Sequence, residues 1–196
     1  MPTRIPIFCT ADLPASTLNT FLECLDETVE QYKREIVGNP MESTADYVIF
    51  MTSLDEKSIS SNEFAPVEAF TSPFPDWSLE RLRDWFKTNC TKVSGVTCNT
   101  FIVFDKQSAE DETCLLVDVH DSTAISSVRT DFYVPVREAT TMEFGGEWLD
   151  ESILGCFRRS GVVMTKENLK LASDGGMYIE EGEVKVDQAW KDFRNW

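Results

Sequence analysis

The sequence predicts an α+β protein in which a mostly antiparallel sheet, built around a central three-strand meander, is covered by three to four helices. Residues 97–136 read as three β-strands in succession, and segments with helical spacing flank them on both sides. Helices and strands do not alternate strictly, as they do in a parallel sheet. A chain of 196 residues suits one domain, so we expect residues 1–196 to share one fold.

The first half of the chain predicts two helices, two strands and a long loop. Residues 4–9 are a short extended segment, and residues 16–37 place apolar side chains on one face of an amphipathic helix. Residues 47–51 form a short apolar run typical of a buried strand. Residues 54–76 are a lid, a packed loop or a loop that hides a short strand, and their phenylalanines indicate that they pack against the body. Residues 78–90 predict the second helix, capped by its serine.

After the meander, the pattern predicts a third helix, a hairpin and an aromatic tail. Residues 147–159 carry the helical spacing, and residues 162–164 indicate a brief strand. Residues 177–179 and 183–186 are typical of a hairpin that turns through Glu-Gly. The last ten residues space three aromatic side chains along one side of a helix, which we expect to dock on the body: Trp190, Phe193 and Trp196.

The net charge and the first residues of the chain restrict the expected partners and compartment. With 34 Asp and Glu against 18 Lys and Arg, the net charge of -16 would repel nucleic acid and anionic membranes, so neither is expected as a partner. No apolar leader is visible and no apolar run approaches the ~18 residues of a spanning helix. A cytoplasmic location is expected, and the six cysteines are expected to be reduced thiols rather than three disulfides.

Standard cofactor and metal motifs are missing from the sequence. It contains no GxGxxG, Walker glycine loop, HExxH, GxSxG or EF-hand loop, so no cofactor is expected. One histidine and the lack of a CxxC pair argue against a metal site. The acidic run at residues 110–112 lacks the alternating oxygen ligands of a calcium loop and is read as a solvated turn.

The predicted strand register gathers polar side chains at one end of the meander. If Asp105 faces Glu112, then Asn99 lies opposite Asp118 and Thr97 lies opposite His120. If the second turn lies near Ser122, symmetric pairing sets Ser127 opposite His120 and Arg129 opposite Asp118. Alternation then places six side chains on one face at one end of the sheet: Thr97, Asn99, Asp118, His120, Ser127 and Arg129.

These residue types suit acid/base chemistry. Asp118 beside Arg129 would stay ionised and favour a proton on His120, which could then act as a general acid or base, while Arg129 orients a ligand carboxylate or enolate. Asp118, His120 and Arg129 are therefore the candidate catalytic residues, and the substrate-binding candidates are Thr97, Asn99 and Ser127. The alternative is that Asp118 and Arg129 form a surface salt bridge and that His120 merely ends a strand.

A cysteine nucleophile is a further alternative. Cys114 shares a face with His120 but lies roughly 20 Å along the strand. Cys98 is closer, yet it points to the opposite face in the predicted register. A slip of one residue would bring Cys98 to the face of His120.

Two short motifs carry a family resemblance. Val128-Arg129-Thr130-Asp131-Phe132, together with Thr113-Cys114-Leu115-Leu116-Val117-Asp118 after an acidic turn, resembles a domain family of unknown function found in bacteria and filamentous fungi. The resemblance covers the central third of the chain. It implies a shared sheet and assigns no functional residue.

Three functional hypotheses follow. The first is a small-molecule-binding protein or cofactor-free acid/base enzyme of the isomerase or cyclase type, with a small apolar or carboxylate-bearing ligand. The second is a non-enzymatic protein-interaction module that uses the acidic surface and the aromatic tail. In the third, every feature is core or solvated surface.

Overall fold

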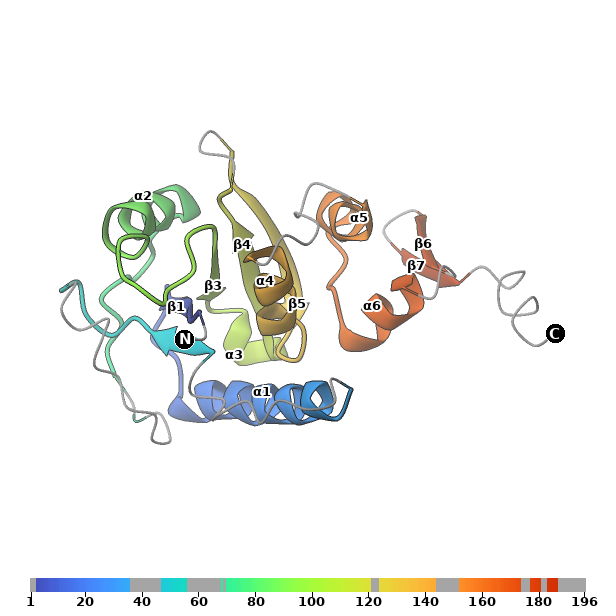
Figure 1. Ribbon diagram of the computed structural model, residues 1–196, viewed down its shortest axis with the longest axis horizontal. Helices are drawn as coiled ribbons and strands as arrows, with labels where there is room; N and C mark the ends of the chain where they lie inside the picture. The colour runs from blue at the N-terminus through green and yellow to red at the C-terminus, as the bar shows by residue number, and fades with distance from the viewer. Residues whose placement is uncertain are drawn as a thin grey trace.

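The computed structural model describes residues 3–35, 47–55, 68, 70–120, 124–143, 152–173, 177–180 and 183–186. In these residues five strands form one mixed sheet, two strands form a separate hairpin, and six helices surround them (Figure 1). The α+β class is confirmed. The prediction of a mostly antiparallel sheet is matched only roughly, because two of the four pairings in the five-strand sheet are parallel.

The parallel half of the sheet is made by two helical crossovers. β1 (Ile5–Cys9) lies between β2 (Val48–Phe50) and β3 (Thr100–Phe104) and is parallel to both. In the chain α1 (Ala15–Glu35) connects β1 to β2, and α2 (Leu79–Asn89) lies between β2 and β3. Parallel neighbours need connections of this length. The expected strands and helices in this half are confirmed, including Ser78 as the cap of α2.

The antiparallel half of the sheet is the predicted meander. β3 pairs with β4 (Thr113–Asp118), and β4 pairs with β5 (Ser126–Asp131), which gives the order β2-β1-β3-β4-β5. A short helix, α3 (Ser108–Asp111), lies in the β3–β4 connection. Beyond β5, Met164 forms an isolated parallel bridge with Thr130, where a brief strand was expected.

The C-terminal elements extend beyond β5. Figure 1 shows α5 (Ser152–Ser160), α6 (Lys166–Ser173) and the hairpin of β6 (Met177–Glu180) and β7 (Glu183–Val186) grouped on that side of the sheet. The hairpin is confirmed, and α5 confirms part of the third predicted helix. Helices α3, α6 and α4 (Pro135–Glu143) were not predicted.

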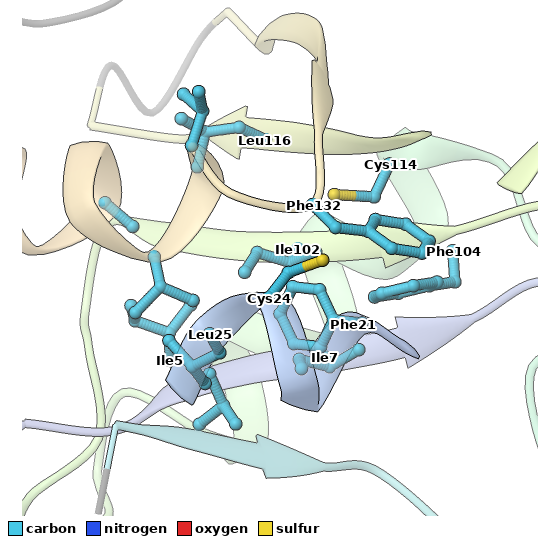
Figure 2. Packing of buried hydrophobic residues seen from close by; sticks show 14 of the residues in the cluster. Ile5, Ile7, Phe21, Cys24, Leu25, Ile102, Phe104, Cys114, Leu116 and Phe132 are labelled. Atoms are coloured by element: carbon cyan, nitrogen blue, oxygen red, sulfur yellow. The ribbon is translucent and has the colours of Figure 1, made fainter. Parts of the chain in front are cut away.

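Each face of the sheet has its own apolar core. On one face α1 packs Phe21 and Leu25 against the central strands, and Figure 2 shows Phe21 beside Phe104 and Phe132. On the other face α2 buries Leu82 and Phe86. α1 and α2 therefore cover opposite faces of the sheet.

Several predictions fall on residues outside the described ranges. The aromatic tail at 190–196 and most of the 54–76 loop are among them. In the described part of that loop, Phe74 is fully buried in the α2-side core, so this part packs against the body as expected. Among the described helices, none combines the length and the apolar character that a membrane span requires.

Candidate functional site

The β3–β4 pairing differs by one residue from the predicted register. Thr100 lies opposite Asp118, where the sequence prediction placed Asn99. The connection explains the difference, because it contains α3 and ends at Glu112 in the left-handed conformation, with φ of 55°. It is therefore not the symmetric loop that the prediction assumed. A slip of one residue exchanges the two faces, so Thr100 rather than Asn99 shares a face with Asp118.

The β4–β5 pairing differs by three residues. Asp118 lies opposite Ser126, and Val117 lies opposite Ser127. Seven residues separate Asp118 from its observed partner, where the predicted register left ten between Asp118 and Arg129, so every partner is moved along the strand. Because three is an odd number, Arg129 and Ser127 lie on the face opposite to Asp118. The predicted pairing of Arg129 with Asp118 is wrong.

Arg129 belongs instead to a network at the other end of the meander. We call it the arginine end: Asp105, Ser108, Asp111, Thr113 and Arg129. The guanidinium forms a bidentate ion pair with the carboxylate of Asp105 and donates to Thr113 Oγ1 at 2.9 Å. Asp105 Oδ1 also accepts the backbone N–H and the hydroxyl of Ser108, at 3.1 and 3.2 Å. The charge of Arg129 is therefore balanced locally, away from His120.

Asp118 and His120 remain together at the end where β4 finishes. We call the group around them the histidine end: Cys98, Asn99, Thr100, Asp118, His120, Ser126 and Glu143. Asp118 is only 6% exposed, and its Oδ1 accepts the backbone N–H of His120 at 2.8 Å. The side chain of His120 is exposed. Ser127 does not lie opposite His120 as predicted, and Ser126 takes the place opposite Asp118.

Glu143, which sequence reasoning missed, fixes the strand that faces Asp118. Its Oε1 accepts the backbone N–H of Asn99 at 2.8 Å and the hydroxyl of Thr100 at 3.1 Å. Its Oε2 lies 3.5 Å from the amide nitrogen of Cys98 and 3.6 Å from the sulfur. The buried hydroxyl of Thr97 donates to the carbonyl of Thr100 at 2.7 Å. Thr97 and Asn99 thus lie near this end of the sheet, but the predicted placement of Asn99 on the face of Asp118 is wrong, because Thr100 takes that position.

Helix α4 brings Glu143 to the histidine end. The helix begins at Pro135, and its missing N–H costs nothing there because the first N–H of a helix has no partner within the helix. Just before it, Asp131 Oδ1 accepts the N–H groups of Tyr133 and Val134, at 3.0 and 3.1 Å. Apolar side chains three residues apart turn the helix onto the α1-side core: Val136, Ala139 and Met142. This spacing was the sequence signal that could have placed Glu143.

The sequence suggested Cys98 as a nucleophile only if the strand register slipped by one residue. The structure has this slip, which moves Cys98 to the face of Asp118. The thiol, however, donates to Glu143. Burial, followed by the charge of Glu143, raises the pKa of Cys98. A raised pKa keeps the thiol protonated, which opposes a nucleophilic role. All six cysteines are free thiols, and burial raises the pKa of Cys9 and Cys114 to about 12.

Metal chemistry finds no support in the described residues, where no group of three or more His, Cys, Asp and Glu side chains could hold an ion. The fold and the site together define an α+β protein with a mixed five-strand sheet and a polar cluster beside its single histidine. Compared with protein families, with curated proteins and with solved structures, the chain matches none. The family resemblance of the central strands therefore stays a prediction.

Proposed function

We propose that this chain binds a small molecule at the histidine end and transfers protons there without a cofactor, as an isomerase or cyclase does. One observation carries the proposal: Glu143 on α4 accepts hydrogen bonds from Asn99 and Thr100, and Thr100 lies directly opposite Asp118 on the neighbouring strand. His120 is two residues beyond Asp118, and its backbone N–H donates to that carboxylate. Two carboxylates and an exposed imidazole, from α4 and the end of β4, are the side chains that general acid/base catalysis uses.

His120 is the proton-transfer group in this proposal. Imidazole exchanges protons near neutral pH more readily than other side chains. It would take a proton from one atom of the bound molecule and return it to another, which leaves the protein unchanged after each turnover. Asp118 acts as a positioning residue, because its carboxylate holds the backbone N–H of His120.

A deuterium-exchange screen tests the proposal. Small carbonyl compounds, amines and carboxylic acids are incubated with the protein in D2O, and incorporation of deuterium at carbon is followed by NMR. We expect at least one compound whose exchange the protein accelerates, with the acceleration lost in His120→Gln and reduced by about tenfold or more in Asp118→Asn.

Ser127→Ala is the matched control, because Ser127 lies on the opposite face and its loss should leave the exchange rate unchanged. Both site variants must keep the melting temperature of the wild type within a few degrees. If no compound exchanges faster, or if His120→Gln exchanges as fast as the wild type, proton transfer at His120 is wrong.

A further inference from the structure

We draw no further inference here: the strongest candidate, the half-buried face of β4 and β5 on the α2 side of the sheet, formed by Leu115, Ser127 and Arg129 with Ile125 just before β5, carries no proposal because nothing in the described part of the structure shows what covers it.

Discussion

The two ends of the meander differ in the groups that contact their carboxylates. At the arginine end, the guanidinium of Arg129 is matched by Asp105, and their side chains are only 15% and 28% exposed. At the histidine end, the backbone N–H of His120 donates to Asp118, and the backbone N–H of Asn99 and the hydroxyl of Thr100 donate to Glu143. One network is therefore centred on an ion pair, and the other on carboxylates that order the backbone at the strand ends.

This difference separates stability from function. A part-buried ion pair that satisfies its own hydrogen bonds leaves nothing for a ligand, and its loss damages the fold. A carboxylate that orders the backbone at a strand end and is partly exposed, as Glu143 is, can also contact a ligand. We therefore expect substitutions at the arginine end to lower stability, and substitutions at the histidine end to lower binding.

Removal of the guanidinium should give the largest loss of stability. Arg129→Ala leaves the part-buried carboxylate of Asp105 without its partner, so we expect a loss of about 2 kcal/mol in the free energy of unfolding, measured by urea denaturation. Lys106→Ala is the control, because Lys106 and Asp76 pair at 3.5 Å with both side chains 81% exposed. Its effect should stay within about 0.5 kcal/mol. Equal effects would show that the arginine end is an ordinary surface pair.

A double-mutant cycle should locate the partner of Arg129. The coupling energy between Arg129→Ala and Asp105→Ala is expected at about 1 to 2 kcal/mol, because the two side chains share an ion pair. The same cycle with Asp118→Ala should give coupling within about 0.5 kcal/mol, because Asp118 lies on the other face. Strong coupling to Asp118 would restore the register that the sequence predicted.

Glu138 on α4 is a third carboxylate to compare, because its side chain is buried. Its Oε1 lies 3.8 Å from Arg137 Nε. Burial raises the pKa of Glu138, and the charge of Arg137 only partly opposes this. The folded chain thus binds this proton more tightly than the unfolded chain does. Its contribution to stability is present at low pH and is lost as the pH rises from the ordinary carboxyl range through the raised pKa.

Glu138→Gln should remove that pH dependence. At pH 7 the variant is expected to be more stable than the wild type by about 1 kcal/mol, with little difference at pH 4, as measured by thermal unfolding across this range. Glu143→Gln is the comparison, because Glu143 lies on the same helix, accepts the N–H of Asn99 and is less buried than Glu138. A wild type that gains stability relative to Glu138→Gln as the pH rises would contradict the assignment.

Local patterns of sequence were reliable for the elements and unreliable for their pairing. The spacing of Leu18, Phe21 and Leu25 predicted α1, and these side chains are buried as expected. The same pattern could not show that β3 pairs with β1, because a parallel pairing is decided by how α1 and α2 pack on opposite faces. A choice between tertiary arrangements leaves no periodic signal in a strand of five residues.

The candidate site shows a similar limit. Asp118 and His120 were placed together correctly, since they lie two residues apart at a strand end. Arg129 was misplaced because its partner depends on the register of the β4–β5 pairing, which sets Arg129 opposite Leu115 rather than Asp118. Glu143 was missed because it acts on Asn99 across 44 positions in the chain. Such contacts are fixed by the whole fold, while residue types alone suggested only the chemistry.

Thiol reactivity gives the finest test of the histidine end, because Cys98 senses the charge of Glu143 directly. The exposed cysteines are Cys98 and Cys156, so these two should react with a disulfide reagent in the folded chain. The four buried cysteines should react only after unfolding. Burial and the neighbouring carboxylate raise the pKa of Cys98, which lowers its thiolate fraction at neutral pH. Glu143→Gln removes the charge and should therefore speed the reaction of Cys98 by about two- to fivefold.

Cys156 is the internal control in the same experiment. It lies on α5, with its sulfur 3.5 Å from Arg159, so its rate should not respond to Glu143→Gln. Peptide mapping by mass spectrometry after short reaction times gives both rates in one sample. If both cysteines accelerate together, the variant has loosened the fold. If the reaction rate of Cys98 does not change, its thiol does not respond to the charge of Glu143 in solution, and the contact between the two side chains is wrong.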